Sequence, residues 1–127
     1  MEGQRAPYNA LVPGFSAALL LEEYGDHALV RELAQLLIDT TPAQLDAIRT
    51  AVAAGDAASL RTAAHRLRGS LVAFGVPDAV ETARTLEAMG ESGELAGAEA
   101  LSVALIDDVQ SLRESARAWL ETGTATA

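Results

Sequence analysis

Apolar residues recur along this chain at intervals of three and four, which is the period of amphipathic α-helices. One stripe, between residues 56 and 74, consists of Leu60, Ala64, Leu67, Leu71 and Phe74. A second stripe, near the C-terminus, consists of Leu101, Leu105, Val109, Leu112, Ala116 and Leu120. Because each stripe follows one face of a helix, the pattern predicts helices that bury one side against one another.

Glycine and aspartate mark the first helix boundaries. We expect a short helix from Phe15 to Tyr24 that stops at Gly25, followed by a helix that Asp26 caps. This second helix is predicted to carry four leucines on one face, namely Leu29, Leu33, Leu36 and Leu37.

The segment from Thr41 to Gln44 has the spacing of a capping box, with Pro42 at the first helical position. It predicts that a new or sharply kinked helix begins there. The residues that this helix is expected to bury are Leu45, Ile48 and Val52.

Later boundaries follow the same logic. We expect a helix over residues 56–74, ended by Gly75, then a helix over about 77–89, a turn at 91–94 and a last helix over about 96–120. Short connections between amphipathic helices favour antiparallel neighbours. The sequence therefore predicts an all-α fold, an up-down antiparallel four-helix bundle with an extra short N-terminal helix.

Length and composition fit one domain. The chain has 127 residues, half of them hydrophobic, and only 4% are aromatic, which favours helices over strands. We expect an irregular lead-in over residues 1–14, the helical bundle over residues 15–121 and a frayed tail over residues 122–127.

The net charge limits the kinds of partner that the protein can bind, and the cysteine content limits the kinds of site that it can form. A formal net charge of −9 argues against binding to nucleic acid or to an anionic membrane, so a protein partner is favoured. The absence of cysteine excludes disulfides, zinc–thiolate sites and thiol nucleophiles. No apolar run approaches the roughly 20 residues that span a bilayer. The first ten residues lack the layout of a signal peptide, so we expect a cytoplasmic protein.

His65 lies off the apolar stripe of its helix. At about 100° per residue it falls roughly 140° from the centre of that stripe, so its ring is expected to reach solvent. The neighbours on the same outward side are Arg61, Arg68, Gly69 and Val72. A glycine inside a helix costs about 1 kcal/mol relative to alanine, so Gly69 calls for a reason, and close approach of a partner molecule supplies one.

This arrangement suits phosphoryl transfer. A neutral imidazole has a lone pair on one ring nitrogen that can attack phosphorus without an activating base. The phosphorylated ring carries negative charge, which a guanidinium one helical turn away can stabilise. Arg68 is the first candidate for this role and Arg61 the second.

The segment from His65 to Ser70, followed by Gly75, resembles the signature of histidine-containing phosphotransfer (HPt) domains, in which a histidine is followed by a basic residue, glycine and serine. Residues 39–56 and the pair Leu86-Glu87 are also similar to that family, so the resemblance covers about residues 26–90. It implies a helical bundle that shuttles a phosphoryl group between receiver-domain aspartates or from a histidine kinase, with His65 as the phospho-accepting residue.

Three positions depart from the family pattern. Arg68 stands where lysine is usual, which keeps the charge but changes its reach and geometry. Leu71 stands where a second serine is common, and Val76 where alanine is common. Leu71 belongs to the apolar stripe, so its change is interpreted as packing.

Several residues have a second interpretation. Arg61 is equally well explained as a solvated surface arginine, and Gly69 also fits close helix packing. Ser70 either bonds back to a helix carbonyl or supports the phosphate site indirectly. We interpret His27 as structural or solvent-facing, and Trp119 as a residue at the edge of the core.

Enzyme signatures are missing from the sequence. It has no glycine-rich nucleotide loop, no His-Glu-x-x-His metal helix and no nucleophile elbow. The acid pairs Glu22-Glu23 and Asp107-Asp108 fall on different helix faces and are expected to be solvated charge. We therefore expect a phosphocarrier that has no nucleotide or hydrolytic site of its own, no cofactor and no metal site.

The leading hypothesis is a phosphorelay intermediate that binds a response-regulator receiver domain, a histidine kinase, or both. His65 accepts the phosphoryl group, Arg68 and Arg61 stabilise it, and the docking surface consists of Gly69, Val72 and Ser70. The alternative is a helical adaptor or inhibitor that binds a kinase or receiver domain without carrying phosphate. A monomer is expected, because the helices can bury their stripes on one another.

Overall fold

The computed structural model describes residues 14–122, so most of the predicted lead-in (1–14) and tail (122–127) lies outside the described residues. The described chain forms five α-helices and one short 3-10 helix. These elements are α2 (Ala17–Tyr24), α3 (His27–Ala54), α4 (Ala57–Leu71), η2 (Val72–Phe74), α5 (Pro77–Ser92) and α6 (Ala98–Thr122).

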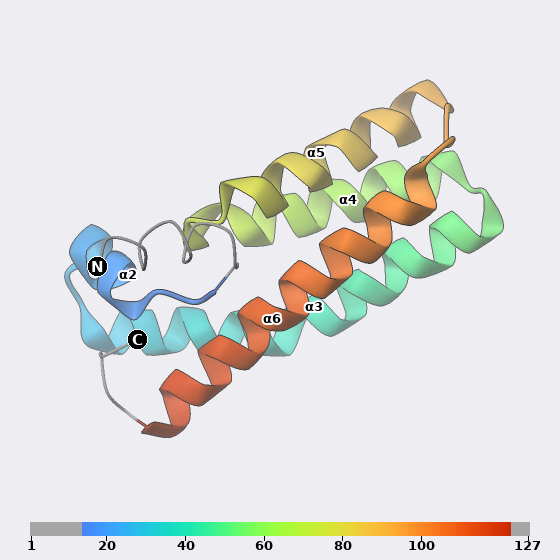
Figure 1. The fold of residues 1–127 in the computed structure, drawn as a ribbon. Helices are drawn as coiled ribbons and strands as arrows, with labels where there is room; N and C mark the ends of the chain where they lie inside the picture. Colours follow the sequence, from blue (N-terminus) through green and yellow to red (C-terminus); the bar gives the residue numbers. More distant parts are fainter. Residues whose placement is uncertain (1–13, 123–127) are drawn as a thin grey trace, which may run out of the picture.

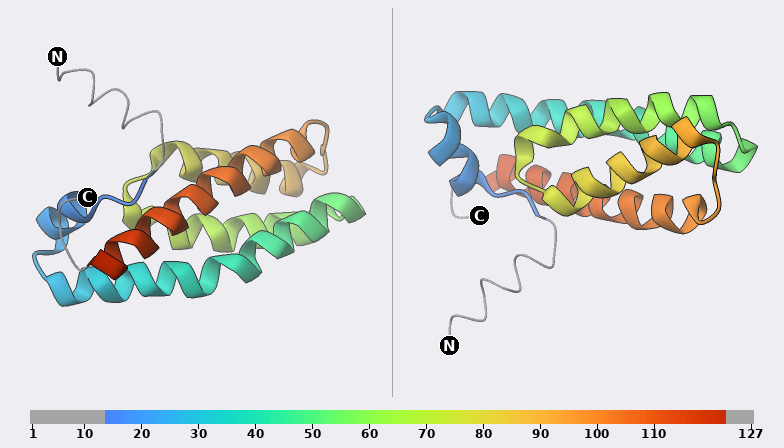
Figure 2. Two further views of the ribbon diagram at one scale, coloured as in Figure 1. Left: turned by 60° about the horizontal axis from the view of Figure 1, so that its bottom comes forward. Right: turned by 90° about the horizontal axis from the view of Figure 1, so that it is seen from above.

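Four long helices form the bundle. α4 packs against α3 and α5, and α6 packs against α5 and α3, so the four helices close on themselves around one core (Figure 1). Successive helices run in opposite directions, and the two turned views show the same up-down arrangement (Figure 2). The predicted all-α bundle with an extra N-terminal helix is confirmed.

The short helix α2 lies at the end of the bundle where α4 ends and α3 begins (Figure 1). Phe15, just before α2, is tied to α6 because its backbone N–H donates to the Ser115 hydroxyl at 3.0 Å. Its ring lies 5.3 Å from the Trp119 ring and 6.3 Å from the Phe74 ring, measured between centroids. Trp119 is only 2% exposed, so it belongs to the core beneath α2 rather than to its edge.

α3 runs through Pro42 as one helix, so the predicted new helix at Thr41 is wrong. The hydroxyl of Thr41 does not cap a helix start but donates back to the Leu37 carbonyl at 2.7 Å. Proline has no N–H for the Ile38 carbonyl, four residues earlier. The Arg113 guanidinium on α6 donates to that carbonyl at 3.2 Å, so a hydrogen bond from another helix replaces the missing one.

The buried face of α3 matches the predicted leucine face only in part, because Leu37 is buried and Leu33 packs against the core. Leu29 is 36% exposed and Leu36 is 57% exposed, whereas the side chains that face the core include Val30, Ala34 and Thr41. Small residues permit the close approach of packed helices, and a search for large apolar side chains overlooks them. The predicted stripe of α4 is confirmed, because Leu60, Ala64, Leu67, Leu71 and Phe74 are all buried.

α4 ends earlier than the sequence predicts. Its α-helical part stops at Leu71, and the tighter turn of η2 carries the chain to Gly75. Gly75 has a φ of 68°, in the left-handed region that favours glycine, and this turns the chain toward Pro77 at the start of α5.

Gly90 brings α5 close to α4. A Cβ at this position would lie 2.5 Å from the backbone nitrogen of Arg61 and 2.7 Å from the Ala57 carbonyl oxygen. Only glycine allows two helix backbones to meet at this distance without a shift of one of them. One turn earlier on α5 and one turn later on α4, the antiparallel course of the two helices brings Glu87 opposite His65.

Candidate functional site

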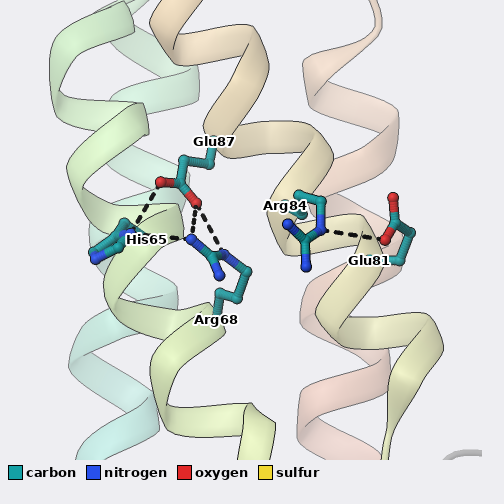
Figure 3. Close-up of polar contacts among 5 residues, drawn as sticks. All are labelled: His65, Arg68, Glu81, Arg84 and Glu87. Carbon is teal, nitrogen blue, oxygen red and sulfur yellow. Dashed lines mark hydrogen bonds and ion pairs between the residues drawn. The ribbon is translucent and has the colours of Figure 1, made fainter.

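His65, Arg68 and Glu87 form one polar cluster on the surface between α4 and α5 (Figure 3). The His65 side chain is 65% exposed, so its ring is open to an approaching molecule. Arg68 and Glu87 are more enclosed, with 24% and 20% of their side chains exposed. The reactive ring therefore lies at the surface while its two charged neighbours lie beneath it.

Each Glu87 oxygen has its own partner. Oε2 lies 2.9 Å from His65 Nδ1. Oε1 accepts from Arg68 Nε at 2.9 Å and lies 2.8 Å from Arg68 Nη2. Glu87 thus links the imidazole to the guanidinium, and it holds both through charge-assisted contacts.

The contacts of Nδ1 favour one tautomer of His65. Arg68 Nη2 also lies 3.2 Å from Nδ1, but a single ring nitrogen either carries a proton or accepts one. The shorter contact, to the carboxylate, requires Nδ1 to donate its proton to Oε2. In the neutral ring Nε2 then has the free lone pair, and with 65% of the side chain exposed it is the nitrogen available for attack on phosphorus.

The charge of Glu87 is maintained by its neighbours. Partial burial disfavours the charged carboxylate, but hydrogen bonds from Arg68 and His65 and the charges of these two groups outweigh it, so the pKa of Glu87 is lowered below its ordinary value. Glu87 is therefore ionised at neutral pH, and it can accept a hydrogen bond from Nδ1–H of the neutral ring and of the imidazolium.

The other predicted site residues lie around this cluster on α4 and η2. Arg61 is exposed, one turn before His65. Gly69 is exposed, and a Cβ there would meet nothing within 4 Å, so close helix packing does not require this glycine. Val72 is 61% exposed. The Ser70 hydroxyl accepts from Gln44 Nε2 at 3.0 Å and so joins α4 to α3.

Glu87 is the site residue for which the sequence predicted no role. Arg68 follows His65 by three residues on the same helix, so its proximity can be read from spacing. Glu87 is 22 positions away on another helix, and its contact depends on how α4 and α5 are aligned. A signal does exist in the sequence, since the pair Leu86-Glu87 is part of the resemblance to the HPt family.

The acid pair Asp107-Asp108 was predicted to be solvated, and this holds for only one of its two carboxylates. Asp107 is exposed, but Asp108 is partly buried. Burial and the nearby charges of Asp107 and Asp78 raise the pKa of Asp108.

Over residues 14–122, no group of three or more histidine or carboxylate side chains could hold a metal ion. Within the same range no helix is long and apolar enough to cross a bilayer.

The fold is thus an antiparallel helical bundle that presents an exposed histidine on α4, four residues before Gly69. The model of the family described as "Hpt domain" matches residues 32–118 of this chain. The chain belongs to this family, and Hpt domains are phosphocarriers rather than catalytic enzymes. Kinases and receiver domains are the general partners of the family.

The chain is also similar to individual proteins. The chain is 30% identical over 119 residues to the virulence sensor protein BvgS of Bordetella bronchiseptica and, to the same extent, to BvgS of Bordetella parapertussis. The match covers 91% of this chain but only 10% of either relative. The crystal structure of histidine-containing phosphotransfer protein B (HptB) from Pseudomonas aeruginosa PAO1 has the same fold, with a TM-score of 0.72 and 24% identity over 84% of this chain and 91% of that one.

Proposed function

We propose that this protein is a phosphorelay intermediate that carries a phosphoryl group on Nε2 of His65. The group comes from a histidine kinase or a receiver-domain aspartate and passes to another receiver domain. The observation that carries the proposal is the contact between His65 Nδ1 and Glu87, which leaves Nε2 as the free, exposed nucleophile.

Transfer from an aspartyl phosphate balances without a cofactor from this chain. The Nε2 lone pair attacks phosphorus while the P–O bond to the aspartate breaks, and its electron pair leaves with the carboxylate. The ring keeps its Nδ1 proton and becomes positively charged, and the Glu87 carboxylate at 2.9 Å stabilises that charge. Transfer to the next receiver reverses these steps.

Arg61 and Arg68 are the guanidinium groups nearest in sequence to His65 on its exposed side. Arg68 is engaged by Glu87, whereas Arg61 is exposed and makes no ion pair with any residue between 14 and 122. We assign the direct contact with the phosphoryl oxygens to Arg61, because a free guanidinium can move toward a dianion at little cost.

The docking surface is proposed to include Gly69, Val72 and Ser70. A hydrogen atom in place of a side chain at Gly69 leaves the space beside His65 open, and Val72 supplies an exposed apolar contact. Gly69→Gln is expected to weaken receiver binding. Ala104→Gln, the same type of change at an exposed position of α6, is the control that should leave binding unchanged.

Phosphoryl transfer is tested by incubating the protein with a panel of phosphorylated receiver domains and with histidine kinases, and then looking for acid-labile, base-stable label. The expected result is label on the wild type, none on His65→Gln, and wild-type labelling of His27→Gln, the variant of the only other histidine. Tight binding across the panel with no label on the wild type would instead support the adaptor or inhibitor alternative.

A further inference from the structure

We infer that Arg68 is a positioning residue that acts on His65 through Glu87, rather than a residue that holds the phosphoryl group. The inference rests on the proposed phosphocarrier function and concerns the chemistry of the same site. It assigns to Arg68 a role different from the one that its place three residues after His65 predicts.

The contacts of Arg68 converge on Glu87. Two of its nitrogens, Nε and Nη2, lie 2.9 and 2.8 Å from the same oxygen, Oε1 (Figure 3). This pairing uses the fork of the guanidinium, which a lysine ammonium cannot reproduce with its single nitrogen. The other oxygen of Glu87 is left for the imidazole, so the three residues form a relay in the order Arg68, Glu87, His65.

The side of the ring that Arg68 approaches supports the same conclusion. Its recorded contact with the imidazole is with Nδ1, at 3.2 Å. Nδ1 is committed to the carboxylate, and the phosphoryl group bonds to Nε2 on the opposite side of the ring. Arg68 is also only 24% exposed, so in this arrangement it lies beneath the ring and not beside the incoming group.

Charge explains why Glu87 needs this partner. An unneutralised carboxylate beside His65 would repel the phosphoryl dianion and would itself bind a proton more readily. Arg68 cancels that charge and fixes the carboxylate in the orientation that accepts the Nδ1 proton. Removal of Arg68 should therefore allow the imidazole to populate the other tautomer, which has its proton on Nε2 and no nucleophilic lone pair there.

The tautomer can be measured in the unphosphorylated protein, without any partner, from the ¹⁵N chemical shifts of the His65 ring. We expect the wild type to carry its neutral-ring proton on Nδ1. Both Arg68→Met and Glu87→Ala should shift the population toward the Nε2–H form, and the double variant should resemble Glu87→Ala. Arg84→Met is the matched control, because it removes an arginine–glutamate pair with Glu81 on α5 that does not touch His65.

Reactivity is measured with phosphoramidate, a small phosphoryl donor with a P–N bond. Nε2 attacks phosphorus, the P–N bond breaks, and the leaving nitrogen takes a proton and departs as ammonia. Arg68→Met is expected to slow this labelling several-fold in the wild-type background and less than twofold in the Glu87→Ala background. An equal fold-loss in both backgrounds would show that Arg68 acts on the phosphoryl group directly and would overturn the inference.

Arg68→Lys provides a test that does not depend on tolerance of Arg68→Met. The ammonium keeps the charge but cannot make two contacts to Oε1, so it should restore the labelling rate only as far as it restores the Nδ1–H tautomer. Full recovery of the rate without recovery of the tautomer would contradict the inference. The tautomer result stands apart from the phosphocarrier proposal, which fails if receivers and kinases leave no label on the wild type.

Discussion

At the scale of single residues, the two histidines, His27 and His65, show how the chemistry of a side chain depends on its neighbours. His27 is the first residue of α3, and its ring lies 5.4 Å from the Trp119 ring, measured between centroids. His65 is equally part of a helix, but it meets a carboxylate that selects its tautomer. Both residues are exposed, so exposure alone would not separate them.

The sequence predicted the local part of the site and not the part that comes from another helix. The outward position of His65 and the nearness of Arg68 follow from helical periodicity. The contact with Glu87 needs the register of α5 against α4, which depends on Gly90 packing against the backbone of Arg61. Spacing alone led to a direct role for Arg68 and could not show that Arg68 pairs with Glu87.

Asp108 gives the first prediction, which concerns pH. Its folded pKa is raised by burial and by the charges of Asp107 and Asp78, so its charged form costs folding free energy at neutral pH. An acid whose folded pKa lies above the unfolded value loses that cost as the pH falls through the folded pKa toward the unfolded one. Asp108→Asn should therefore raise the free energy of unfolding at pH 7 and give no such gain below the unfolded pKa.

Urea unfolding of both proteins at pH 7 and at about pH 3 measures this difference. Asp107→Asn is the control, because it removes only the repulsion from an exposed neighbour and should give a smaller gain at pH 7. An equal gain from Asp108→Asn at both pH values would show that the effect comes from packing and not from ionisation.

At the scale of secondary structure, two helix contacts depend on backbone atoms. Pro42 leaves the Ile38 carbonyl without its usual donor, and Arg113 of α6 supplies one. Gly90 removes the side chain that would separate α5 from α4. From the sequence, proline and glycine are both expected to interrupt a helix. In the structure each lies inside a continuous helix, because a neighbouring helix supplies the missing donor at Pro42 and requires the missing side chain at Gly90.

Arg113→Met should destabilise the protein by about 1–3 kcal/mol, because a partly buried carbonyl loses its hydrogen bond. In a Pro42→Ala background the residue at position 42 has an N–H that can bond Ile38 within α3, so the same Arg113→Met change should cost less. Urea unfolding of the two single variants and the double variant gives the coupling between positions 42 and 113. Additive effects would show that Arg113 stabilises the fold by some other contact.

Gly90 and Gly69 should respond in opposite ways to alanine. Gly90→Ala forces a methyl group against the α4 backbone and is expected to destabilise by about 1–3 kcal/mol. Gly69→Ala adds a methyl group in open space on a helix and is expected to stabilise by about 0.5–1 kcal/mol. Unfolding midpoints measure both effects.

The same pair of variants links helix spacing to the site. Because Gly90 lies one turn from Glu87, Gly90→Ala should also shift the His65 ring toward the Nε2–H tautomer, whereas Gly69→Ala should not. A destabilised Gly90→Ala protein with an unchanged His65 tautomer would mean that the α4–α5 spacing does not control the contact between Glu87 and His65.

At the scale of the whole molecule, the closed bundle was predictable because its connections are short and its helices amphipathic. Which side of α3 is buried was harder to predict, because Ala34 and Thr41 face the core while the larger Leu36 is 57% exposed. Helix packing is decided by shape on both partners, and one sequence stripe gives only one of them. The net charge, in contrast, can be counted from the sequence alone, and it predicts how added salt changes the stability of the fold.

The chain has 18 acidic and nine basic residues, a formal net charge of −9, so its folded state concentrates like charges. Only three arginine–carboxylate ion pairs are found between residues 14 and 122. Added salt screens the net repulsion over the whole surface and weakens these few pairs, so we expect the repulsion to dominate. The urea midpoint should therefore be higher at 0.5 M sodium chloride than at low salt, with an unchanged slope of the unfolding free energy against urea. This salt concentration is about five times the ionic strength at which the Debye length is ~10 Å.

The control is the double variant Glu22→Gln with Glu23→Gln, which removes two exposed acids of α2 and should reduce the rise of the midpoint with salt. A midpoint that falls with salt would show that local ion pairs outweigh the net charge.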